Sequence, residues 1–151
     1  MNTKSQNNLT KMLITLESSL TCMISQLPAQ HSEVEDIKTL LTFSKNFAEA
    51  YGKTWSSIRW NRSSSKIKKQ VRAQLTQIAG MVYQNLCEAG TAMQEYEAKY
   101  GALPETVTAA FTLAYYEFCT RQGRDLPQVP EDHKLQANQM DIYRLALKAL
   151  K

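Results

Sequence analysis

The chain has 151 residues, of which 43% are hydrophobic and 21% are charged, and it carries a formal net charge of +4. This length and composition are typical of one globular domain, so we expect a single helical domain over residues 1–151. The five glycines and four prolines are few, which argues against a loop-rich or all-β design. No run approaches the roughly 18 apolar residues of a membrane-spanning helix, so we expect no membrane partner.

Three cysteines, Cys22, Cys87 and Cys119, lie far apart in the sequence. An odd number of scattered cysteines indicates free thiols rather than a disulfide framework. The first eleven residues are polar and no apolar run like that of a signal peptide follows them. We therefore expect a cytoplasmic protein.

The first predicted helix carries one apolar stripe with alternating steps of four and three residues. Pro28 ends it. The stripe fits a helix of an ordinary bundle, and it also fits a helix that joins two copies of the chain as a homo-oligomer. Its members are Leu9, Leu13, Leu16, Leu20, Met23 and Leu27.

A second helix is predicted from Ser32, where Ser32 and Glu35 match the S-x-x-E capping box. Gly52 is the expected end of this helix. Its broad apolar face consists of Ile37, Leu40, Leu41, Phe43, Phe47, Ala48 and Tyr51.

Residues 53–65 are predicted to form a connector, because three consecutive serines, Ser63 to Ser65, favour a helix N-cap over a helix interior. A third helix is expected from Lys66. Gly90 and Gly101 are both candidate ends of this helix. Its apolar stripe continues past Gly90 to Tyr100, so we favour one long central helix of about 50 Å at 1.5 Å per residue, either straight or kinked at Gly90-Thr91.

Pro104 suits the first position of a fourth helix. The segment from Arg121 to Gln128 is a polar connection, and a fifth helix is predicted from Glu131 to Lys151. We find no alternating strand pattern. The expected fold is therefore an all-α bundle of about five helices.

Local motifs for chemistry are missing from the sequence. His31 and His133 are the only histidines, and neither has a second ligand at metal-binding spacing. No glycine-rich phosphate loop and no local nucleophile–base pair occurs. We therefore expect no metal, no cofactor and no enzymatic activity; an enzyme would need a site assembled entirely from distant residues.

Charge is concentrated in one stretch. Residues 50–87 carry seven cations and no acid, whereas residues 1–49 and 88–151 have net charges of −1 and −2. Cations bind phosphates, and tryptophans offer faces on which unpaired bases stack. We predict a non-enzymatic accessory or architectural protein that binds the backbone of RNA or DNA through Lys53, Trp55, Arg59, Trp60, Arg62, Lys66, Lys68, Lys69 and Arg72.

The same features allow another interpretation. The cations could dock on an acidic protein partner or in a larger complex, which would make the chain an adaptor or an inhibitor. Trp55 and Trp60 could then serve the hydrophobic core at the end of the second helix.

Overall fold

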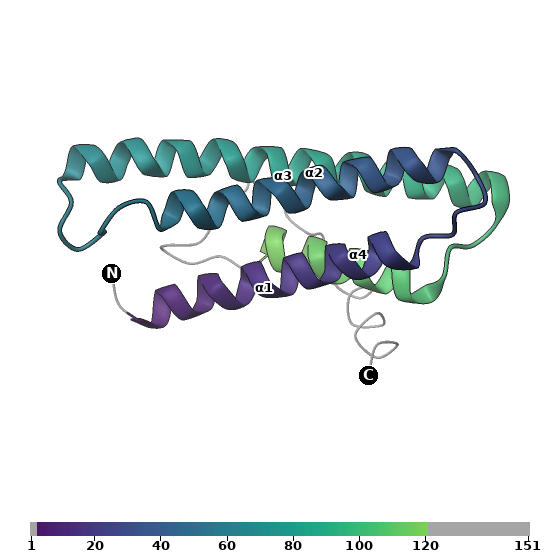
Figure 1. The fold of residues 1–151 in the computed structure, drawn as a ribbon, viewed down its shortest axis with the longest axis horizontal. Helices are drawn as coiled ribbons and strands as arrows, with labels where there is room; N and C mark the ends of the chain where they lie inside the picture. Colours follow the sequence, from purple (N-terminus) through teal and green to yellow (C-terminus); the bar gives the residue numbers. More distant parts are fainter. Residues whose placement is uncertain (1–2, 121–151) are drawn as a thin grey trace.

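The computed structural model describes residues 3–120, which form four α helices and no strand (Figure 1). The predicted all-α bundle is thus confirmed for this part of the chain. The helices run up and down in sequence: α2 lies beside α3 in one layer, and α1 lies beside α4 in the other. Their bounds are α1 Thr3–Gln26, α2 Glu33–Trp55, α3 Ser65–Tyr100 and α4 Glu105–Thr120.

The apolar stripe of α1 lies in the core of the bundle. Leu16, Leu20 and Met23 are completely buried, and Leu13 is half-buried. These side chains join the apolar faces of the other three helices in one hydrophobic cluster. The heptad spacing of α1 therefore serves packing within the chain.

Two local predictions for α2 are wrong. Ser32 has helical backbone angles, φ −64° and ψ −29°, and its side chain caps no backbone amide; its hydroxyl donates to Glu33 instead, at 3.1 Å. The helix also continues through Gly52 to Trp55. At Gly52 an added Cβ would lie 3.3 Å from Leu13 Cδ1 of α1, so this glycine allows a close approach of two helices and does not end one.

The long helix α3 is continuous over 36 residues, which corresponds to about 54 Å. Ser64 caps its start, with its hydroxyl oxygen accepting from the Ile67 amide at 3.2 Å. The helix passes through Gly90, where the Phe111 ring of α4 packs directly on the backbone. It ends at Gly101, whose φ of 101° favours glycine, as the sequence predicted.

The start of α4 agrees with the prediction to within one residue. The Pro104 carbonyl accepts from the amides of Val107 and Thr108, so Pro104 immediately precedes the helix. The predicted connection from Arg121 and the predicted fifth helix from Glu131 to Lys151 lie outside the described residues. None of the four described helices combines the length and the apolar composition that a membrane-spanning helix requires.

Candidate nucleic-acid interface

Seven cations gather at one end of the bundle, where the connector from Ser56 to Ser64 joins α2 to α3. In Figure 1 this end lies on the left, at the teal loop. We call this group the basic end. It consists of Lys53 at the end of α2, Arg59 and Arg62 in the connector, and Lys66, Lys68, Lys69 and Arg72 in the first two turns of α3.

Trp60 anchors the connector to the core. Its side chain is 5% exposed, and its indole N–H donates to the Trp55 carbonyl over 2.8 Å. The two indole rings lie 4.7 Å apart between centroids. Because a buried indole N–H needs an acceptor, this hydrogen bond allows the ring to enter the core and fixes the chain on either side of it.

A tight turn follows, and it brings the two connector arginines to one place. The Arg59 carbonyl accepts from the Arg62 amide at 3.0 Å and from the Ser63 hydroxyl at 2.7 Å. Residues three apart in such a turn have Cα atoms within about 7 Å. Arg59 and Arg62 are both exposed, so the turn presents two guanidinium groups to solvent beside the buried Trp60.

Lysine and arginine side chains continue along the first turns of α3. Lys66, Lys69 and Arg72 are exposed and recur every three residues, so they follow one side of the helix over about 9 Å. Lys68 is half-buried, on the side nearer the core. The Arg72 guanidinium lies 5.0 Å from the centroid of the Trp60 ring, which links α3 to the connector.

Most cations of the basic end have no carboxylate partner among the described residues, although Glu17 and Glu49 line the same groove as Lys53. Six of its cations, all except Arg72, form no ion pair with a carboxylate in the described structure, and residues 50–87 contain no acid. The first turn of α3 contains no acid either. Cations at a helix N-terminus oppose the helix dipole, so these side chains reduce the stability of α3 and are not explained by it.

The N-terminus of α3 adds backbone donors. Ser64 satisfies the amides of Ile67 and Lys68 through its hydroxyl and its carbonyl. The amides of Ser65 and Lys66 have no acceptor within the helix, as expected for the first residues of a helix. Such amides can donate to an anion, and Lys66 and Lys69 lie beside them.

The predicted stacking surface is not offered by this structure. Trp55 is 7% exposed and Trp60 is 5% exposed, and both belong to the hydrophobic core. Their faces are covered by each other and by Arg72. A base could stack on either ring only if the connector first opened, so we attribute to both tryptophans a role in holding the connector.

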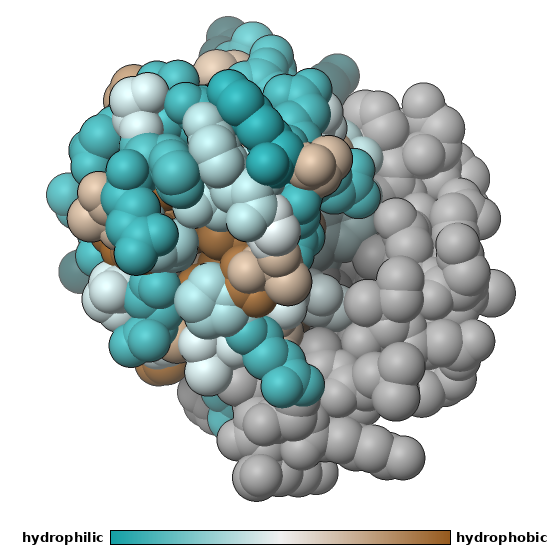
Figure 2. Space-filling model, turned by 90° about the vertical axis from the view of Figure 1, so that its right-hand side faces the viewer, coloured by the Kyte–Doolittle hydropathy of each residue, from teal (hydrophilic) through white to brown (hydrophobic). Residues whose placement is uncertain are grey.

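The opposite end of the bundle is acidic, a feature that sequence reasoning missed because its residues come from distant segments. Figure 2 views this end and shows a mostly hydrophilic surface with apolar residues visible at its centre. The antiparallel packing of α2 and α3 brings together the start of α2 and the end of α3. The carboxylates that this end presents are Glu33, Glu35, Asp36, Glu95, Glu97 and Glu105.

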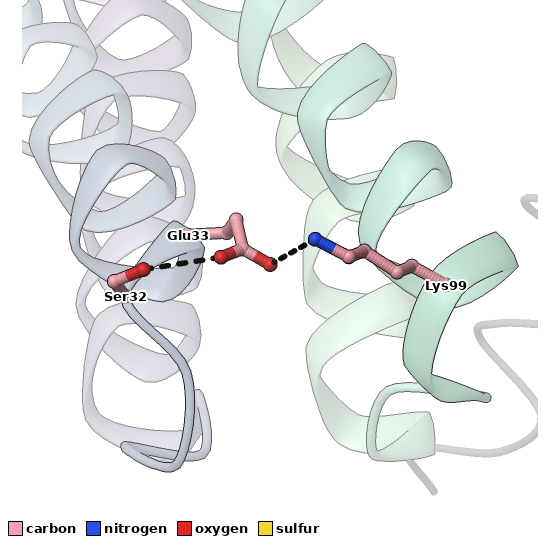
Figure 3. Close-up of polar contacts among 3 residues, drawn as sticks. All are labelled: Ser32, Glu33 and Lys99. Carbon is pink, nitrogen blue, oxygen red and sulfur yellow. Dashed lines mark hydrogen bonds and ion pairs between the residues drawn. The ribbon is translucent and has the colours of Figure 1, made fainter.

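Glu33 joins the two helices at the acidic end (Figure 3). The Lys99 ammonium lies 3.5 Å from its carboxylate, and the Ser32 hydroxyl donates to it from the other side. Hydrogen bonding by Tyr100, and then by Ser32 and Lys99, lowers the pKa of Glu33. Since these contacts lie at the far end of α3 from the basic end, they do not neutralise its cations.

A groove between α1 and α2 has a volume of about 570 Å³ and is lined by Leu13, Ile14, Glu17 and Glu49, among others. Burial raises the pKa of Glu17, and Glu49 raises it further, while Lys45 lowers it. No histidine or cysteine lines this groove. Among the described residues, no group of three or more His, Cys, Asp or Glu side chains could hold a metal ion.

Comparison with protein-family models, with curated proteins and with solved structures gave no significant match. The candidate interface therefore depends on the geometry and the charge of this chain alone.

Proposed function

We propose that this chain binds nucleic acid through the phosphate backbone, as an accessory or architectural protein without catalytic activity of its own. One observation carries the proposal: two adjoining elements present seven cations at one end of the molecule, and no acid lies in residues 50–87. Phosphates are the ligands that such a cluster binds best, because each neutralised phosphate releases condensed counterions. The amides at the start of α3 supply further donors for the same groups.

The proposal is tested by fluorescence anisotropy with a labelled 20-base-pair duplex in about 50 mM salt. The test variant is Lys66→Gln/Lys68→Gln/Lys69→Gln, which removes three charges and keeps a polar side chain with similar helix propensity at each position. Arg72 is left unchanged because it packs on Trp60. We expect micromolar binding by the unmodified chain and a loss of about tenfold or more in the variant.

A matched control removes the same number of charges from other parts of the bundle. Lys38, Lys45 and Lys99 lie on α2 and on the end of α3, outside the basic end. The variant Lys38→Gln/Lys45→Gln/Lys99→Gln should keep its affinity within about twofold, the effect of net charge alone. Equal losses in both triple variants, or no binding by the unmodified chain, would refute the proposal.

An acidic protein partner would contact the same cations, and a further ligand separates the two functions. Poly-glutamate offers carboxylates at high density but no phosphates. Weaker binding of poly-glutamate than of the duplex, at equal salt and equal charge, is expected if phosphates are the ligands. Binding of poly-glutamate at least as tight as that of the duplex would favour the adaptor or inhibitor function.

A further inference from the structure

The aromatic side chains that the structure describes at the basic end are buried. Tyr51, Trp55 and Trp60 are 3%, 7% and 5% exposed. The Trp60 N–H is already bonded to the Trp55 carbonyl, so exposing this ring would break a buried hydrogen bond and open the core. Among the residues that the structure describes, the basic end therefore offers a nucleic acid no exposed aromatic face.

What remains exposed between residues 53 and 72 is almost entirely polar or charged. Apart from the cations, the exposed side chains in this range are mainly serines, Asn61 and Gln70. Ile67 is the one large apolar side chain in this range that is well exposed, at 43%. An aliphatic side chain lacks the flat π-face on which a base stacks, so the surface offers hydrogen bonds and positive charge.

In the described part of the chain, this surface lacks the exposed aromatic rings on which single-strand binders stack bases. Proteins that hold single strands gain about 1–3 kcal/mol for each base stacked on an aromatic ring, in addition to the phosphate contacts. Without stacking, affinity follows the density of phosphates that the cations can reach. A duplex carries about one charge per 1.7 Å of its axis, and each of its two strands supplies only half of that density, about one per 3.4 Å.

We propose that the basic end is a binding site for double-helical nucleic acid. It contacts the phosphates of the duplex and binds a duplex more tightly than a single strand. The inference rests on the proposed function and specifies its substrate class. Phosphate chemistry is shared by duplex DNA and duplex RNA, so both are ligands of the same site. The bases take no part in the binding, and the two tryptophans stay in the core when the duplex binds.

The test compares three labelled ligands in about 50 mM salt: a 20-base-pair DNA duplex, an RNA duplex of the same length, and a 20-nucleotide oligo-thymidine that forms no secondary structure. We expect at least one duplex to bind about fivefold or more tightly than the single strand. The two duplex arms show which backbone geometry fits the cations better.

Intrinsic fluorescence gives an independent readout, because Trp55 and Trp60 are the only tryptophans of the chain. Stacking of a base on an indole would quench its emission, so we expect saturating ligand to leave the emission nearly unchanged. Tighter binding of oligo-thymidine than of both duplexes, or strong quenching by it, would overturn this inference and leave backbone binding intact. Absence of binding to all three ligands would overturn the proposed function itself.

Discussion

Trp60 shows how one buried side chain can hold a surface segment, here the connector of the basic end, in place from inside. Its ring is buried, its N–H donates to the Trp55 carbonyl, and Arg72 covers one face. The residues next to it, Arg59 and Asn61, are exposed. Because the ring fixes the connector from inside, the arginines beside it are held at the surface.

Two glycines of α3 differ sharply in their surroundings. At Gly90 an added Cβ would lie 2.8 Å from Phe111 Cζ, whereas at Gly80 it would meet nothing within 4 Å. We expect Gly80→Ala to raise the free energy of unfolding by about 0.5–1 kcal/mol, through helix propensity. Gly90→Ala should lower it by about 1 kcal/mol or more, because the ring must shift.

Urea denaturation followed by circular dichroism measures both glycine variants. A stabilising Gly90→Ala would show that Phe111 does not pack on α3 at this point.

Glu17 gives a stability effect that depends on pH. Its pKa is raised above the ordinary value of 4.5, chiefly by burial and then by Glu49. The protonated form is thus favoured on folding, and this contribution is present below pH 4.5 and lost as the pH rises through the raised pKa. We expect Glu17→Gln to raise the melting temperature at pH 7 and to have almost no effect near pH 3.5.

The control for this pH dependence is Glu95→Gln on the exposed surface of α3. It should give no comparable rise at pH 7. A shift of the Glu17→Gln melting temperature that is the same at both pH values would contradict the electrostatic explanation.

At the scale of elements, periodicity predicted more than local end signals did. The apolar stripe of the third helix correctly continued through Gly90, because α3 packs along α2 and Phe111 of α4 contacts α3 at Gly90. The predicted helix end at Gly52 was wrong, because Gly52 lies against Leu13 of α1 inside the helix. The predicted side-chain cap by Ser32 was also wrong, because its hydroxyl donates to Glu33. Such tertiary contacts override signals that depend on a few adjacent residues.

The candidate site could also be predicted only in part from the sequence. Its cations could be predicted, because they are contiguous in sequence. The burial of the tryptophans could not, because it depends on how the connector returns to the core. The acidic end could not be predicted either, because Glu33 and Glu95 are distant in sequence and come close together only when α2 packs against α3.

The two serines at helix starts provide a matched test at this scale. Ser64 caps α3 through its hydroxyl, whereas Ser32 makes no side-chain cap. We expect Ser64→Ala to cost about 1 kcal/mol of stability and Ser32→Ala less than about 0.5 kcal/mol, measured by urea denaturation. Equal costs would contradict this assignment of the caps.

At the scale of the molecule, the described bundle carries opposite charges at its two ends. From Arg72 to Glu95 the helix α3 extends about 35 Å, several times the screening length of about 8 Å at physiological salt. The acidic end therefore barely affects a ligand at the basic end, but a duplex would be repelled from it at closer range. We infer that the bundle approaches a duplex with its basic end first.

The most direct test of this account is the dependence of duplex affinity on salt. The slope of log K against log salt should fall in magnitude by about 3 in the Lys66→Gln/Lys68→Gln/Lys69→Gln variant, about one unit for each lost phosphate contact. The Lys38→Gln/Lys45→Gln/Lys99→Gln control should keep the slope of the unmodified chain. An unchanged slope in the first variant would show that these lysines do not contact phosphates and would contradict the account.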